Sequence, residues 1–131
     1  SRADVDSTRL GYYGLSWGGS MASIMLAIEP RLKAAVLTCP GLYLERAQPE
    51  VDGFNFVSRV RQPVLMVGGR YDALSPLLTS QLPMYRLLGS PPAQKQDLTF
   101  SQPLPLASAW PPYWLHGGQH EPHTRLPPRN Y

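Results

Sequence analysis

The sequence predicts an α/β fold in which a parallel sheet is flanked by helices. Short apolar runs bounded by glycine or proline alternate with apolar stretches of helical length from about residue 10 to residue 89. The 131 residues, with 43% hydrophobic content and a net charge of +3, suffice for one globular domain with a core. A strand, helix and strand in succession imply a right-handed crossover between parallel strands, so we expect helices on both faces of the sheet.

The first strand and the first helix meet at a glycine-rich turn. Residues 10–14 form a short apolar run, and residues 17–28 form a longer apolar stretch without proline. Ser16 lies between them, in the pattern Gly-x-Ser-x-Gly that it makes with Gly14 and Gly18. In a nucleophile elbow this pattern exposes a serine hydroxyl on a sharp strand-to-helix turn. We expect both glycines to remove side chains that would collide with the neighbouring backbone.

The place of Ser16 before a helix also favours acyl-transfer chemistry. Unpaired backbone N–H groups and the helix dipole at a helix N-terminus stabilise developing negative charge. The N–H of Trp17 is therefore a candidate donor of the oxyanion hole. An ordinary glycine-rich turn without a catalytic role is the alternative interpretation.

The second strand is predicted over residues 33–39 and is closed by Pro40. Cys39 at its end is interpreted as a buried thiol without a reactive role. A polar loop region follows, with a short helix near residues 54–60. The aromatic residues of this region are candidate walls of a substrate pocket or ordinary packing residues: Tyr43, Phe54 and Phe56.

The third strand is the clearest in the chain, because Pro63 and paired glycines bound the apolar residues 63–69. The next helix is predicted to begin at Pro76, with Ser75 as its N-cap, and to end near Leu88.

Residues 97–131 break the alternation of strands and helices. They contain seven of the fifteen prolines, and within them only residues 97–101 suit another strand. We therefore divide the chain into residues 1–96 and an irregular Pro-rich tail, residues 97–131, which is either disordered or the product of an altered reading frame. The chain begins at Ser1 without an initiator methionine, which indicates a fragment.

Asp72 stands where a catalytic carboxylate is expected. It lies between the strand 63–69 and the helix that begins at Pro76, in a loop at the carboxyl end of a parallel strand. A catalytic serine needs a base, usually a histidine oriented by a carboxylate, and the chain order Ser, Asp, His suits this type of fold. A solvated loop aspartate is the alternative interpretation.

Three segments together resemble a known family: the elbow at residues 14–19, the strand at residues 33–37, and residues 63–72 with Pro76. They are similar to the C-terminal half of an α/β-hydrolase, over roughly residues 3–96. The resemblance is closest to the prolyl oligopeptidase and dienelactone hydrolase-like branch, including hydrolase domains attached to bacterial serine/threonine kinases.

The resemblance implies a partial α/β-hydrolase fold, with residues 1–96 as the C-terminal part of the domain. It implies Ser16 as the nucleophile and Asp72 as the orienting acid. A dienelactone hydrolase proper carries cysteine at the nucleophile position, so a serine there implies esterase or peptidase chemistry. The family's first half, which supplies the second oxyanion donor, has no counterpart here, so we expect a remnant of three strands with exposed apolar faces and a tendency to aggregate.

The triad histidine is not assigned uniquely by the sequence. His120 follows a Gly-Gly-Gln segment and His123 precedes Pro-Pro-Arg-Asn, so each matches half of the family's signature. We expect His120 to complete the triad, with His123 and His116 as alternatives. The competing interpretation is a catalytically inert hydrolase fragment or interaction domain that lacks a working histidine.

The same histidines, with Glu121, suggest a zinc site, which we reject. The spacing of His116, His120 and His123 is not His-Glu-x-x-His, and Pro122 prevents a helix that would align two ligands. No metal and no cofactor are therefore expected.

Composition excludes several other classes. The basic residues are scattered and no apolar stretch is long enough for a membrane span, so neither nucleic acid nor membrane is an expected partner. A single cysteine excludes an internal disulfide and favours a reducing, cytoplasmic compartment. The sequence thus predicts a serine hydrolase that acts on a small-molecule ester or peptide, with other domains attached in the intact protein.

Overall fold

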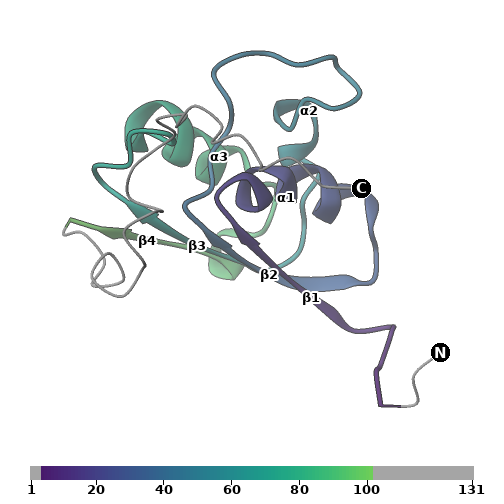
Figure 1. The fold of residues 1–131 in the computed structure, drawn as a ribbon. Helices are drawn as coiled ribbons and strands as arrows, with labels where there is room; N and C mark the ends of the chain where they lie inside the picture. The colour runs from purple at the N-terminus through teal and green to yellow at the C-terminus, as the bar shows by residue number, and fades with distance from the viewer. Residues whose placement is uncertain (1–3, 102–131) are drawn as a thin grey trace, which may run out of the picture.

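A four-stranded parallel sheet forms the centre of the computed structural model, which describes residues 4–101. The strands are β1 (Leu10–Leu15), β2 (Leu32–Thr38), β3 (Val64–Gly69) and β4 (Lys95–Phe100). They pair in chain order, and each neighbouring pair is parallel. The carboxyl ends of all four strands therefore lie at one edge of the sheet (Figure 1).

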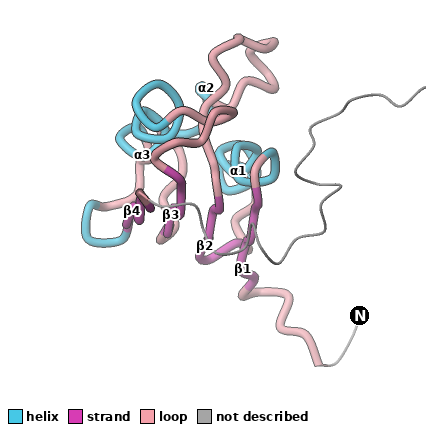
Figure 2. The backbone as a smooth tube through the Cα atoms, turned by 60° about the vertical axis from the view of Figure 1, so that its left-hand side comes forward, coloured by secondary structure: helices cyan, strands magenta, loops and turns pink. Residues whose placement is uncertain are grey.

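The helices lie on one side of this sheet. α1 (Trp17–Ile28) follows β1, α2 (Phe54–Val57) follows β2, and α3 (Leu82–Leu87) follows β3. Figures 1 and 2 show these three helices over the same face. The expectation that helices cover both faces is therefore wrong for residues 4–101. Because the spatial order of the strands equals their chain order, successive right-handed crossovers all fall on the same face.

The core lies between the helices and the covered face. Along β3 buried and half-buried residues alternate, as expected for a strand with one packed face. The buried apolar side chains of this core are Ala22, Leu26, Leu32, Ala35, Leu37, Leu42, Val57, Val60, Val64, Met66, Met84 and Leu88.

Within residues 4–101 the opposite face of the sheet is open and apolar. Its exposed side chains are Tyr13, Leu15, Val36, Leu98 and Phe100.

The sequence predicted exposed apolar faces, but on a remnant of three strands. The fourth strand, β4, includes residues on both sides of position 96. Because residues 102–131 lie outside the described residues, the division of the chain at residue 96 stays a prediction.

The helical segment after β3 differs from the predicted one at its start. It begins with a π-helical turn, η1 (Leu77–Gln81), which continues into α3. The predicted cap at Ser75 is wrong, because Pro76 is the N-cap residue and no side chain among residues 4–101 caps the segment. Pro83 has no N–H to donate to a carbonyl of the preceding turn, which favours an altered hydrogen-bond register there.

A single-turn 3₁₀ helix, η2 (Pro92–Gln94), leads into β4. Within residues 4–101 no helix has the length and the apolar character needed to cross a membrane.

Candidate active site

Ser16 has the backbone geometry of a strained turn between a strand and a helix. It lies between the last residue of β1 and the first residue of α1, with φ 53° and ψ −114°. A positive φ is uncommon for a residue with a side chain, and such strain is often found at functional sites. The Ser16 N–H donates to the carbonyl of Thr38 at 2.8 Å, which ties the turn to β2. The side chain is exposed.

The glycines around Ser16 do not contribute equally. A Cβ atom at Gly14 would lie 2.5 Å from the Gly18 carbonyl oxygen, so Gly14 permits α1 to start directly against β1. The matching expectation for Gly18 is wrong within the described residues, because a Cβ atom there would meet nothing within 4 Å. Gly19 permits a second close approach, because a Cβ atom placed there would lie 3.1 Å from Cβ of Pro40. The bare motif could not reveal this, because Gly19 packs against a residue 21 positions away.

The start of α1 is held against the sheet by Tyr12. Its hydroxyl donates to the Gly18 carbonyl at 2.6 Å. The first N–H groups of a helix have no partner within that helix, and Trp17 supplies the first of them in α1. The Trp17 side chain is 68% exposed, so the entrance to this turn is open to solvent in residues 4–101.

Asp72 lies in the loop between β3 and η1. Its Oδ1 atom accepts hydrogen bonds from the backbone N–H groups of Leu74 and Ser75, both at 2.9 Å. These bonds hold Oδ1 within its own loop, while the residue as a whole is half-exposed.

Cys39, the residue that follows β2, lies beside Asp72. Burial raises the pKa of the Cys39 thiol, and the Asp72 carboxylate, which accepts a hydrogen bond from the thiol, raises this pKa further. The thiol is half-buried and its backbone φ is 49°. The raised pKa agrees with the expected unreactive thiol, but the sequence did not predict the contact with Asp72. The parallel order of β2 and β3 was the signal that could have indicated it.

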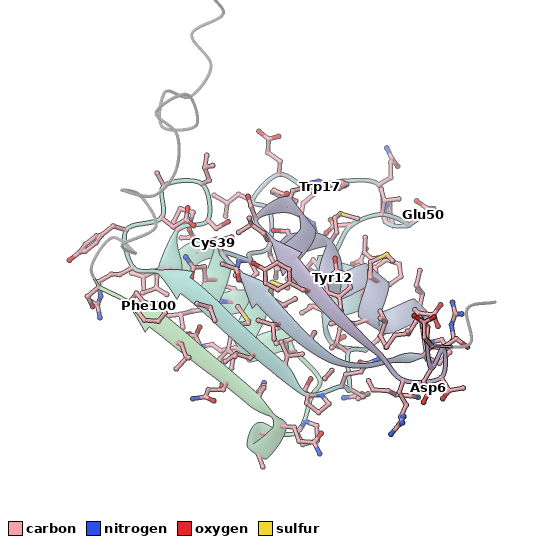
Figure 3. All side chains as sticks on the ribbon, turned by 60° about the horizontal axis from the view of Figure 1, so that its bottom comes forward. Asp6, Tyr12, Trp17, Cys39, Glu50 and Phe100 are labelled. Carbon is pink, nitrogen blue, oxygen red and sulfur yellow. The ribbon has the colours of Figure 1, made fainter. Side chains whose placement is uncertain are left out.

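Ser16, Cys39 and Asp72 therefore follow three neighbouring strands at the same edge of the sheet. Figure 3 shows Trp17, Cys39 and Phe100 toward this end of the strands. This is the edge at which open α/β sheets bind ligands.

The loop after β2 forms a cavity next to α1. The cavity has a volume of about 290 Å³, and Tyr43 and Phe54 line it together with Ser20. Ser20 is one turn after Ser16 and donates its N–H to the Ser16 carbonyl at 3.0 Å. Of the three predicted wall residues, Phe56 is not among those that line this cavity.

The candidate histidines His116, His120 and His123 lie outside the described residues, as does Glu121 of the rejected zinc site. Within residues 4–101 no three His, Cys, Asp or Glu side chains are grouped so that they could hold a metal ion.

No protein-family model matches the chain. It is 34% identical over 87 residues to Cutinase 2 of Thermobifida cellulosilytica, a match that covers 66% of this chain and 29% of that protein. Among solved structures, a putative dienelactone hydrolase from Klebsiella pneumoniae is similar with a TM-score of 0.64 and 27% identity, covering 76% of this chain and 42% of that one. An acetyl xylan esterase from Paenibacillus sp. R4 shares the fold with a TM-score of 0.63 and 22% identity, covering 82% and 45%.

The predicted partial α/β-hydrolase fold is confirmed by these likenesses together with the parallel sheet and its flanking helices, and the narrower branch stays a prediction. The chain spans less than a third of the length of the curated cutinases that it matches. It belongs to the α/β-hydrolase superfamily, and it contains a part of that fold.

Proposed function

We propose that the chain is part of a serine hydrolase of the esterase or peptidase type, with Ser16 as its nucleophile. The observation that carries the proposal is the strained, exposed Ser16 at φ 53° in a glycine-bounded turn before α1. Support comes from Asp72, whose carboxylate is held at the same edge of the sheet. The names of the similar proteins, cutinase and esterase, favour an ester as the substrate.

In the proposed reaction the Ser16 hydroxyl oxygen attacks the carbonyl carbon of the ester or amide and gives its proton to a histidine. The N–H of Trp17 stabilises the negative charge on the carbonyl oxygen. The histidine then protonates the leaving alcohol or amine, and water hydrolyses the acyl-serine.

His120 is the proposed base, with His123 and His116 as alternatives, and Asp72 orients it. Oδ2 of Asp72, which takes neither of the bonds from Leu74 and Ser75, is the atom that we assign to this contact.

A fluorophosphonate probe tests the proposal on the full chain of 131 residues. We expect covalent labelling of Ser16 because the probe reacts with an activated serine. Labelling should disappear in Ser16→Ala and persist in Ser58→Ala, a control at another exposed serine. The histidine variants to compare are His120→Ala, His123→Ala and His116→Ala. The one that removes the catalytic base should react with the probe on the order of 10²–10⁴-fold more slowly than the wild type.

If the chain gives a folded circular dichroism spectrum but no labelling, the proposal is wrong. That result would favour the competing interpretation, an inert hydrolase fragment or interaction domain.

A further inference from the structure

One buried side chain fixes both ends of the loop that carries Asp72. Gln81, at the end of η1, is 1% exposed. Its Nε2 atom donates to the carbonyl of Gly69 at 3.0 Å and to the carbonyl of Ser75 at 2.6 Å. Gly69 is the last residue of β3 and Ser75 immediately precedes the N-cap of η1, so the two bonds close the segment 70–74.

The backbone around Gln81 is shaped to admit its amide. A Cβ atom at Gly68 would collide with Oε1 of Gln81, so the glycine in β3 leaves the space that the amide occupies. The backbone N–H groups of Ser80 and Gln81 both donate to the carbonyl of Pro76, at 2.9 and 3.3 Å. This wide turn anchors η1 directly after the loop.

The amide of Gln81 uses its donor atom and leaves its acceptor atom without a bond within the described residues. Oε1 of Gln81 is buried and has no hydrogen-bond partner within the described residues. A buried acceptor without a partner is unfavourable. An apolar side chain of the same length would avoid that penalty but would remove the bond to the Ser75 carbonyl. What the amide adds is the pair of bonds from Nε2 to the Asp72 loop.

These contacts continue to the Asp72 carboxylate. The carbonyl of Ser75 accepts the shorter bond from Gln81, while the N–H of Ser75 donates to Oδ1 of Asp72. We propose that Gln81 is a positioning residue, which holds the Asp72 carboxylate in the direction that the triad histidine requires. This inference rests on the proposed function for its catalytic consequence, but its structural part does not.

The test compares Gln81→Met, which keeps the length of the side chain and removes the donor, with Met84→Ala as a control. Met84 is fully buried near the start of α3, so truncating it lowers stability through lost packing and leaves the bonds from Gln81 to the loop in place. For the full chain acting on an ester substrate we expect Gln81→Met to lower kcat about 10- to 100-fold with KM unchanged, because a small displacement of a catalytic group has an effect of this size. Met84→Ala should leave kcat unchanged.

The pH profile separates positioning from a merely structural role. A carboxylate near the histidine favours its charged form, so a displaced Asp72 lowers the pKa of the base. The acidic limb of the kcat/KM profile should therefore move to lower pH in Gln81→Met. Gly68→Ala pushes the amide away while leaving Gln81 in place, and it should produce the same shift, which gives a second variant if Gln81→Met does not fold.

Amide hydrogen exchange provides a measurement that does not depend on activity. The N–H groups of Leu74 and Ser75, which bind Asp72, should exchange faster in Gln81→Met and not in Met84→Ala once global stability is accounted for. Unchanged exchange, an unchanged pH profile, or an equal loss of kcat in Met84→Ala would each overturn the inference. If Ser16 is inert in the wild-type chain while exchange still responds, the proposed function fails and the hold of Gln81 on Asp72 stands.

Discussion

At the scale of single residues, the turn at Ser16 depends on one very close approach between backbone segments. Gly14 in β1 and Gly18 in α1 are separated by less than the space that a methyl group needs, and the hydroxyl of Tyr12 bonds to the carbonyl of the same Gly18. The helix therefore begins directly against the strand. The positive φ of Ser16 is a consequence of this sharp reversal.

The two motif glycines should respond differently to substitution. Gly14→Ala places Cβ 2.5 Å from the Gly18 carbonyl oxygen, and overpacking of this kind destabilises by about 1–3 kcal/mol. Gly18→Ala meets open space inside a helix, where alanine is favoured over glycine by up to about 1 kcal/mol. Urea unfolding of the two variants measures the difference. Equal destabilisation would contradict the asymmetry and would indicate that another part of the protein covers Gly18.

At the scale of elements, the loop between β2 and α2 is held by one side-chain cluster beside the cavity. Nε of Arg46 donates to Oδ2 of Asp52, and Oδ1 of Asp52 accepts from the N–H of Phe54 at 3.0 Å. The Arg46 guanidinium also lies 4.5 Å from the centroid of the Phe54 ring. Asp52 thus links the loop to the start of α2, and the hydrogen bond from Arg46 lowers the pKa of its carboxyl group.

This linkage predicts a loss of stability in acid. The pKa of Asp52 is lower in the folded chain than in the unfolded chain. The Asp52 charge therefore stabilises the fold fully above the ordinary carboxyl pKa of about 4, and this stabilisation is lost as the pH falls through the pKa of the folded chain. Thermal melts should show a lower Tm for Asp52→Asn than for the wild type at pH 7, and the gap should close toward pH 3. A gap that is constant with pH would mean that the Asp52 charge contributes nothing. Glu50→Gln, which removes a carboxylate at another exposed position of this loop, serves as the control for altered charge.

Glycine and proline made the elements predictable, because these residues mark the positions where strands and helices begin and end. The helix at residues 17–28 has the bounds of α1, and the strand at residues 63–69 differs from β3 by one residue. Prediction failed where the partner is distant in sequence. Gly19 packs against Pro40, 21 positions away, and no pattern around Gly19 indicates this contact.

At the scale of the whole molecule, the sheet has one covered face and one face that is open in the described part of the chain. The open face presents Tyr13 at 67% exposure and Phe100 at 41%, from strands at opposite edges of the sheet. A contiguous apolar surface of this kind marks an interface or a site of aggregation. Comparison with the longer relatives agrees with a partial fold, since the match covers 29% of Cutinase 2.

Charge on the open face should suppress association of the full chain. We expect the hydrophobic dye ANS to bind the wild-type chain, and Val36→Lys combined with Leu98→Lys to reduce both dye fluorescence and light scattering. Both positions are exposed, so the double variant retains the core. Glu50→Lys with Thr79→Lys adds lysines at exposed positions away from this face and should change neither signal. Equal dye binding by all three proteins would show that the face is already covered.

The sequence by itself determined the first three strands, the helices that follow them, their order and the superfamily, because strand and helix signals are local and the elbow is a contiguous pattern. It also indicated Ser16 and Asp72 as the candidate pair, since the carboxyl ends of parallel strands meet at one edge. The tertiary structure alone decided which face of the sheet is covered, which glycines are in close contact, and that Cys39 and Gln81 adjoin the Asp72 loop. These features depend on how the folded backbone brings side chains and glycines together in space, which the residue pattern alone does not specify.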